Sequence, residues 1–231
     1  MLTTERVGPI AHDPAAELWA WGWLVHSEPQ VRTRLLEIAR FHGWDPNALA
    51  AVIAFESGGD PSARNRQSSA TGLIQFMPQT AEALGTSIAR LRVMSALRQL
   101  DFVERYYQSA LYGKTPTEVG DYYMAVFMPG AVGKPDELEL GRKGQKIYDQ
   151  NAGLDRDGDG VLNVGDVKQT FRASFLKTKP SERIDLTAPA VLPPPHSAFG
   201  LRPSSGRRGL IGLALVSGAG IAWWLRHKGI L

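Results

Sequence analysis

Residues 51–80 read AVIAFESGGDPSARNRQSSATGLIQFMPQT, and this stretch places one acid, Glu56, at the end of an apolar run. A polar loop follows, and the segment GLIQFMP then returns the chain to apolar side chains. Glu56 lies seven residues after Leu49, so it falls on the apolar stripe of a helix. Desolvation there favours a neutral carboxyl, which makes Glu56 a candidate proton donor. A solvated carboxylate is the plainer interpretation of this residue taken alone.

Helical spacing of apolar residues surrounds this stretch on both sides. Asp45-Pro46 is the pair of N-cap and first-turn residues that begins many helices. The patterns predict helices over 18–25, 31–41, from 46 onward, from 78 onward, 94–112, 117–128 and 141–151. No stretch alternates with period two for long enough to predict a sheet. The sequence therefore predicts a mainly α-helical protein.

Composition narrows the function classes. The 231 residues include 26 basic and 23 acidic ones, and the net charge of +3 is too small and scattered to predict a nucleic-acid partner. There are no cysteines, which excludes disulfides, thiol catalysis and cysteine-bound metals. Residues 1–13 contain one basic residue and two acids and lack a long apolar core, so they do not resemble a signal peptide.

The C-terminal part has a different character. Prolines are frequent over 177–205, which predicts an extended linker. The run GLIGLALVSGAGIAWWL at 209–225 carries no charge, and as a helix it would be about 26 Å long. That length is slightly short of a bilayer core of roughly 30 Å. We expect a transmembrane helix, with a buried terminal helix as the alternative. Basic residues flank both ends, so they do not fix its orientation.

Short blocks in a fixed order surround Glu56. They are Glu56-Ser57, Pro61, Ala63, ATGLIQFMP at 70–78, Thr80-Ala81, Leu84-Gly85-Thr86, Met94-Ser95, Gln99-Leu100 and YMAV at 123–126. Their order and spacing over 31–134 resemble the lytic transglycosylases of the goose-lysozyme-like superfamily, and the later blocks resemble the phage virion-associated type. The resemblance implies a lysozyme-like helical catalytic domain.

The resemblance also implies a reaction. Such enzymes cleave the β-1,4 bond between N-acetylmuramic acid and N-acetylglucosamine in peptidoglycan. Glu56 would protonate the glycosidic oxygen and then, as a carboxylate, accept the proton of the muramoyl C6 hydroxyl, which closes a 1,6-anhydro ring. One carboxyl suffices because the substrate supplies the nucleophile, unlike glycosidases that use two carboxylates. Ser57 would orient Glu56, and Gln75 would face the sugar.

Two positions depart from the family pattern. Phe127 stands where the family usually has Tyr. Either Tyr123, one helical turn earlier, supplies that hydroxyl, or the reaction needs none. We therefore count Tyr123 and Phe127 among the substrate-binding candidates. Ser69 stands where a Gly is usual. Asp60 leaves a hydrolytic, lysozyme-like route open, because it could help to activate water.

The segment DRDGDGVLNVGD at 155–166 is a second motif. Its spacing resembles an EF-hand or dockerin calcium loop, with Gly at the sixth position and Asp rather than Glu at the twelfth. The expected Ca²⁺ ligands are Asp155, Asp157, Asp159, the Val161 carbonyl and Asp166. Four carboxylates so close together repel one another without a cation, and we expect a structural ion. A solvated acidic turn is the alternative.

These features predict a membrane-tethered peptidoglycan lytic transglycosylase of a phage virion. It would act in the periplasm or cell envelope, and other virion proteins are candidate partners. The expected divisions are an N-terminal helical segment at 1–30, the catalytic domain at 31–150, the calcium loop at 151–175, the linker at 176–208 and the membrane helix at 209–225. The alternatives are a hydrolytic muramidase, a non-catalytic wall-binding module, and a virion protein that forms a membrane conduit.

Overall fold

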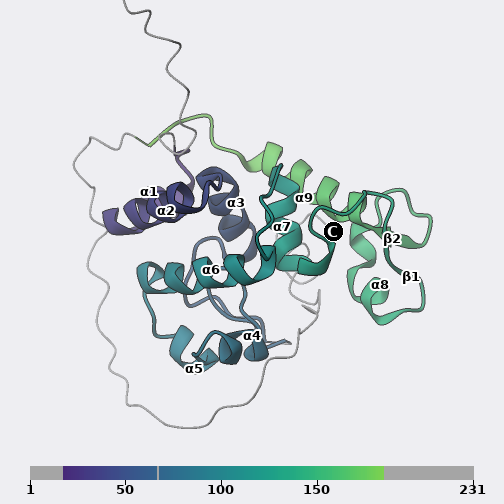
Figure 1. Ribbon diagram of the computed structural model, residues 1–231, viewed down its shortest axis with the longest axis horizontal. Coiled ribbons are helices and arrows are strands. Elements are labelled where there is room, and N and C mark those ends of the chain that lie inside the picture. The colour runs from purple at the N-terminus through teal and green to yellow at the C-terminus, as the bar shows by residue number, and fades with distance from the viewer. Residues whose placement is uncertain (1–17, 67, 185–231) are drawn as a thin grey trace, which may run out of the picture.

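Helices dominate the residues that the computed structural model describes, which are 18–66 and 68–184 (Figure 1). The elements are α1 (Gly22–Val25), α2 (Pro29–His42), α3 (Pro46–Ser57), α4 (Pro78–Ala83), α5 (Ile88–Leu91), α6 (Ala96–Leu111), α7 (Val119–Phe127), η2 (Pro129–Ala131), β1 (Glu139–Arg142), α8 (Lys146–Asn151), η3 (Ala152–Leu154), β2 (Val161–Asn163) and α9 (Val164–Thr178). The predicted mainly helical class is confirmed.

Helix α3 lies in the hydrophobic core and carries Glu56 in its last turn. Asp45 begins the helix, because its carboxylate accepts hydrogen bonds from the backbone N–H of Asn47 at 2.8 Å and of Ala48 at 3.3 Å. Gly58 ends the helix in the left-handed conformation, with φ of 65°. Apolar residues surround α3 on most sides, as expected for a helix inside the protein. The packing of α3 in the core therefore fixes the position of the Glu56 backbone.

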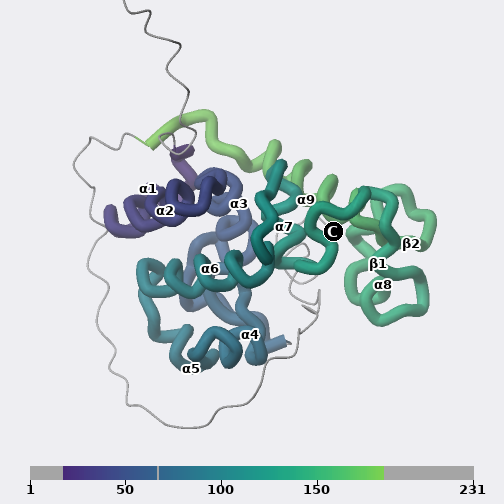
Figure 2. Tube along the Cα trace, in the orientation of Figure 1, coloured from purple at the N-terminus to yellow at the C-terminus, as the bar shows by residue number. Residues whose placement is uncertain are grey.

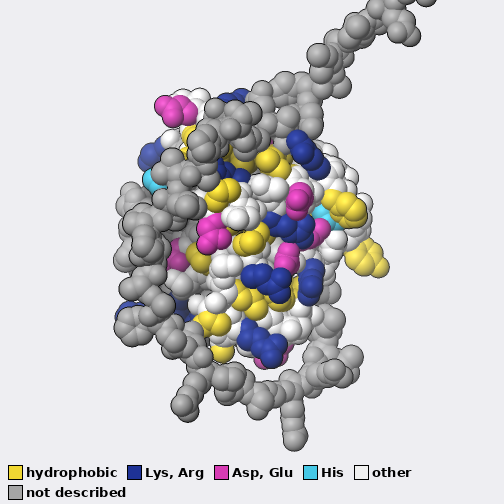
Figure 3. Space-filling model, turned by 90° about the vertical axis from the view of Figure 1, so that its left-hand side faces the viewer, with side chains coloured by type: hydrophobic (Ala, Val, Ile, Leu, Met, Phe, Trp, Pro, Cys, Tyr) yellow, Lys and Arg dark blue, Asp and Glu magenta, His cyan; other side chains and the backbone are white. Residues whose placement is uncertain are grey.

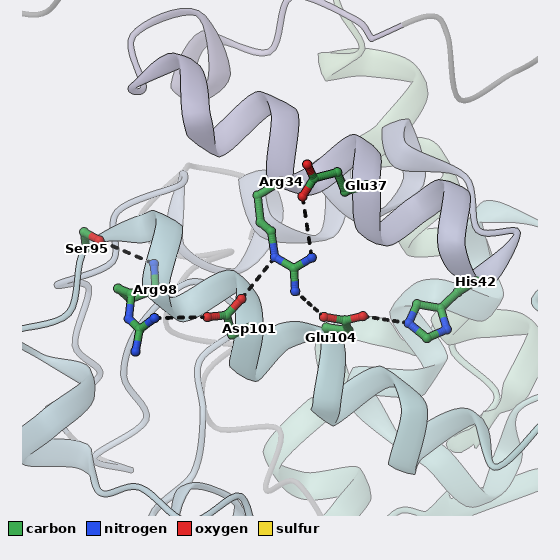
Figure 4. Close-up of polar contacts among 7 residues, drawn as sticks. All are labelled: Arg34, Glu37, His42, Ser95, Arg98, Asp101 and Glu104. Atoms are coloured by element: carbon green, nitrogen blue, oxygen red, sulfur yellow. Dashed lines mark hydrogen bonds and ion pairs between the residues drawn. The ribbon is translucent and has the colours of Figure 1, made fainter.

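A network of charged side chains joins α2 to α6 (Figure 4). The Arg34 guanidinium lies between the carboxylates of Asp101, at 3.0 Å, and Glu104. The second oxygen of Glu104 lies 2.8 Å from Nε2 of His42. Figure 3 shows basic and acidic side chains interspersed on this side of the molecule. Exposed pairs contribute little individually, but a network anchored on one half-buried Arg holds the two helices in register.

The C-terminal part of the described chain differs from expectation in two ways. The predicted helix over 141–151 is only α8, because Gly141 belongs to β1, which pairs antiparallel with β2. The prediction of no sheet is therefore wrong for this pair. Strands of three and four residues are too short to show an alternating pattern, and these two pair across a segment that contains α8 and η3.

The predicted helix over 18–25 is confirmed only for its second half, which is α1. Residues 18–20 instead run beside 182–184, with hydrogen bonds from Ala20 N–H to Glu182 O at 2.9 Å and from Ile184 N–H to Leu18 O at 2.8 Å. Figure 2 shows the end of the described chain returning to its beginning. The first residues of the range expected to be linker are thus part of the fold.

The expected membrane helix at 209–225 lies outside the described residues, as do 1–17 and most of the proline-rich stretch. Within 18–66 and 68–184, none of the helices has both the length and the apolar character needed to cross a bilayer.

Candidate active site

Glu56 is half-buried at the end of α3, among aromatic residues of three helices. Within the described part of the chain, its carboxyl has no hydrogen-bond or ion-pair partner. Burial raises the pKa of Glu56 to about 8. The titratable groups that sense its charge are the hydroxyls of Tyr106, Tyr107 and Tyr123. Glu56 is therefore protonated at neutral pH, as a general acid must be.

Ser57 ties the end of α3 to the loop that follows it. Its hydroxyl is shared as donor between the carbonyl oxygens of Leu73, at 2.9 Å, and Ile53, at 3.1 Å. It also accepts a hydrogen bond from Gly59 N–H at 3.1 Å. The loop residue Leu73 thereby stays next to the turn that carries Glu56. This geometry agrees with a positioning role for Ser57.

Gln75 shapes the same loop. Its backbone is left-handed, with φ of 53°, which is uncommon for a residue with a side chain. Its side-chain amide donates to the carbonyl of Gly72 at 3.0 Å and, more weakly, to that of Ala63 at 3.4 Å. These bonds fix the side chain beside its own loop, and contact with a sugar remains a prediction for Gln75.

Gln99 is a supporting residue whose role sequence reasoning missed. Its side chain in α6 is fully buried and accepts a hydrogen bond from Leu73 N–H at 2.9 Å. It also donates to the carbonyls of Pro61 at 2.6 Å and Leu91 at 2.8 Å. A Gln with its amide buried in this way must find partners, and here they are backbone groups of the loop, at Pro61 and Leu73, and of α5, at Leu91. The sequence contains one signal for this role, because Gln99 is a polar residue next to the apolar face of a strongly amphipathic helix.

Tyr123 and Phe127 lie on α7 and both are buried. The Tyr123 hydroxyl has no hydrogen-bond partner among the described residues, and burial together with the charge of Glu56 raises its pKa. Its ring meets the ring of Phe55 edge to face at 5.0 Å. The ring of Phe127 lies 6.2 Å from that of Tyr123. The structure thus brings Tyr123 into the surroundings of Glu56, with Phe127 packed behind it.

The two remaining loop positions have clear local explanations. Ser69 adopts a φ of 63°, in the left-handed region where glycine is favoured, which explains why a Gly is usual there. Asp60 is exposed, and its carboxylate accepts two hydrogen bonds from Ser62, from the backbone N–H and from the hydroxyl, each at 2.7 Å. Asp60 is therefore engaged in a turn.

The acidic loop lies at the other end of the described chain, between α8 and α9 (Figure 1). Asp155, Asp157 and Asp159 each present a carboxylate oxygen, and these oxygens lie within 4.8 Å of one another. Asp166 is buried in the first turn of α9, where it forms a capping box with Asn163. Val161 belongs to β2.

Comparison with known proteins supports a family for part of the chain. Residues 36–100 match the model of the transglycosylase SLT domain, and this range includes Glu56, Ser57 and Gln75. The helical architecture fits the lysozyme-like fold of that domain. The match supports peptidoglycan lytic transglycosylase activity in general. Tyr123, Phe127 and the acidic loop lie beyond the matched range. No curated protein and no solved structure matches the chain.

Proposed function

We propose that the protein cleaves the β-1,4 bond between N-acetylmuramic acid and N-acetylglucosamine with Glu56 as the only catalytic carboxyl. The observation that carries this proposal is the position of Glu56 in the last turn of the buried helix α3, without a hydrogen-bond or ion-pair partner among the described residues. Burial there raises the pKa of Glu56 to about 8, which favours the protonated acid at neutral pH. The match of residues 36–100 to the transglycosylase SLT domain supports the same substrate. Asp60, the other carboxylate of the loop, is exposed and bound to Ser62, which favours this route over hydrolysis.

The proposed reaction has two proton transfers. Protonated Glu56 donates its proton to the glycosidic oxygen as the bond to C1 of the muramoyl residue breaks. The resulting carboxylate accepts the proton of the C6 hydroxyl, whose oxygen bonds to C1 and gives the 1,6-anhydro product. Glu56 ends protonated and ready for another cycle. Ser57 and Gln99 hold the loop around Leu73 in place, Tyr123 offers its unpartnered hydroxyl to the site, and Gln75 contacts the sugar.

Clearing of purified peptidoglycan by the purified protein tests this proposal. We expect Glu56→Gln to lose clearing while its circular dichroism spectrum is unchanged, because glutamine cannot supply a proton. Asp60→Asn is the matched control, since it neutralises the other loop carboxylate, and it should clear as the wild type does. Loss of clearing in Asp60→Asn would favour a hydrolytic muramidase. Peptidoglycan binding without any clearing by the wild type would favour a non-catalytic wall-binding module.

The biological setting that we propose is a phage virion, in which the enzyme opens the cell wall locally while the genome is delivered. The similarity of the blocks over 84–126 to phage-type members supports it. The uncharged run at 209–225 would tether the enzyme to a membrane of the cell envelope. Detection of the protein in purified particles tests this setting, and its presence only in the cytosol of infected cells would contradict it. Clearing-defective variants that still permit delivery would instead favour a membrane conduit.

We also propose that the acidic loop binds one structural Ca²⁺. The carboxylate oxygens of Asp155, Asp157 and Asp159 lie within 4.8 Å of one another and suit this hard cation. Asp166 lies outside this cluster, and we propose that it and the Val161 carbonyl complete the ligand set. Backbone N–H groups of the loop donate hydrogen bonds to the carboxylates of Asp155, Asp157 and Asp159, so the chain holds these three close together. The remaining lone pairs fit an oxygen-coordinated ion. Bound Ca²⁺ would supply positive charge between β2 and the start of α9.

A further inference from the structure

Helix α9 packs against the helix that carries Tyr123, although α9 lies well beyond the residues that match the transglycosylase domain. The ammonium of Lys168 is nearly fully buried and lies 2.9 Å from Asp121 and 3.2 Å from Glu118, both at the start of α7. A Cβ added to Gly120 would lie 3.0 Å from the Lys168 side chain. The two helices therefore pack closely, and the buried ion pairs of Lys168 fix how far α9 is shifted along α7.

One turn further along α9, the ring of Phe171 packs against the rings of Tyr123 and Phe55. It lies parallel to the ring of Tyr123, with centroids 4.7 Å apart and an interplanar angle of 7°. It also meets the ring of Phe55 edge to face at 5.3 Å. Phe55 and Tyr123 contact each other at 5.0 Å, so the three rings form one cluster. Phe55 directly precedes Glu56 in α3.

We propose that Phe171 is a positioning residue that keeps Tyr123 beside Glu56 and Phe55 packed under the last turn of α3, and that it excludes water behind these two rings. Phe171 is 1% exposed, and its removal would leave a cavity directly behind both rings. The proposal rests on the proposed function, because it assigns α9 to the wall of the same site. The described catalytic domain would then extend to α9, and would include the acidic loop that precedes it.

The consequence for Glu56 follows from its surroundings. The titratable groups that face it are Tyr106 and Tyr107 on α6 and Tyr123 on α7, and all three are neutral near pH 8. Among the described residues no ion pair compensates for its charge, so exclusion of water sets its protonation. Water admitted by the loss of the Phe171 ring would stabilise the carboxylate of Glu56.

Titration of the Glu56 carboxyl by NMR, in the full chain, tests the proposal directly. We expect the pKa of Glu56 to fall by about one unit in Phe171→Ala and by a smaller amount in Phe171→Leu. Phe175→Ala is the matched control, because Phe175 lies one turn further along α9 and contacts Trp19 and Trp21 instead. It should leave the Glu56 titration unchanged.

The Leu variant keeps most of the buried apolar volume and so guards against a failure of the Ala variant to fold. An unchanged Glu56 titration in folded Phe171→Leu, or an equal change in Phe175→Ala, would overturn the proposal. The activity profile separates this inference from the proposed function. If the wild type clears peptidoglycan, and the activity of Phe171→Leu declines with rising pH at the same pH as that of the wild type, only the role proposed for Phe171 is wrong. If the wild type never clears peptidoglycan, the proposed function fails, and the NMR titration still decides the role of Phe171.

Discussion

The hydroxyl of Ser57 lies 2.9 Å from the carbonyl oxygen of Leu73, which joins the residue after the candidate acid to the far side of its loop. The same hydroxyl accepts a hydrogen bond from Gly59 N–H, so it fixes the chain on both sides of the turn. Gln99 fixes Leu73 from the opposite direction through the Leu73 N–H group. The loop beside Glu56 is thus held by two side chains from different helices.

We expect Ser57→Ala to lower kcat/KM by about tenfold to a hundredfold, because small displacements of a catalytic group are costly. Loss of the hydrogen bond should destabilise the fold by only about 1 kcal/mol. Steady-state kinetics on soluble glycan fragments and thermal unfolding would measure the two effects. Ser62→Ala is the control, since Ser62 is on the exposed part of the loop and bonds only Asp60 among the contacts described. Equal activity in both variants would contradict the positioning role of Ser57.

The pH dependence of catalysis should report the raised pKa of Glu56. The acid must be protonated to act, so kcat/KM should fall as the pH rises through about 8, by up to tenfold per pH unit above it. An ordinary glutamic acid would already lose its proton near pH 4.5. A profile of initial rates between pH 5 and pH 10 checks this. Activity that declines from pH 5 upward would show that Glu56 is not desolvated in the working enzyme.

The same pKa makes a prediction about stability. Between pH 4.5 and about 8, Glu56 loses its proton in the unfolded chain but keeps it in the folded protein, so its burial lowers stability as the pH rises through this window. Below pH 4.5 it is neutral in both states and has no such effect. We expect Glu56→Gln to raise the free energy of unfolding by about 1–3 kcal/mol at pH 8.5 and by almost nothing at pH 4.5. Equal effects at the two pH values would contradict this account.

Calcium should stabilise the protein through the acidic loop. At a concentration of about a hundred times Kd, a ligand that binds only the folded state contributes about 2.7 kcal/mol. We therefore expect Ca²⁺ to raise Tm by roughly 5–10 °C, EDTA to reverse the rise, and Asp157→Asn to abolish it. Glu137→Gln, which removes one exposed negative charge near the loop, should retain the response. An identical Tm with Ca²⁺ and with EDTA would show that the loop is an acidic turn.

Local signals in the sequence predict the helices that carry the site. The elements that these signals do not predict depend on pairing between residues far apart in the chain. Asp45 and Pro46 define the start of α3, and the spacing from Leu49 places Glu56 on its apolar stripe. By contrast, the stabilising partners of β1 and of residues 18–20 lie about 20 and 160 residues away in the chain, at β2 and 182–184.

The role of α9 illustrates the same limit. Phe171 follows the acidic loop, and nothing in its own neighbourhood relates it to Phe55 or Tyr123, which are distant in sequence. Their relationship exists only once α9 packs against α7. The orphaned hydroxyl of Tyr123 is likewise a tertiary feature, because the sequence identifies the residue but not what surrounds it.

In the proposed reaction Glu56 acts alone, first as acid and then as base, with the C6 hydroxyl of the substrate as nucleophile. Mass spectrometry of the muropeptides released by the wild-type protein tests it most directly. We expect 1,6-anhydro-muramoyl ends, each lighter by one water than a reducing end, and we expect them to disappear in Glu56→Gln. Products with reducing muramoyl ends would show that water is the nucleophile and would contradict the claim.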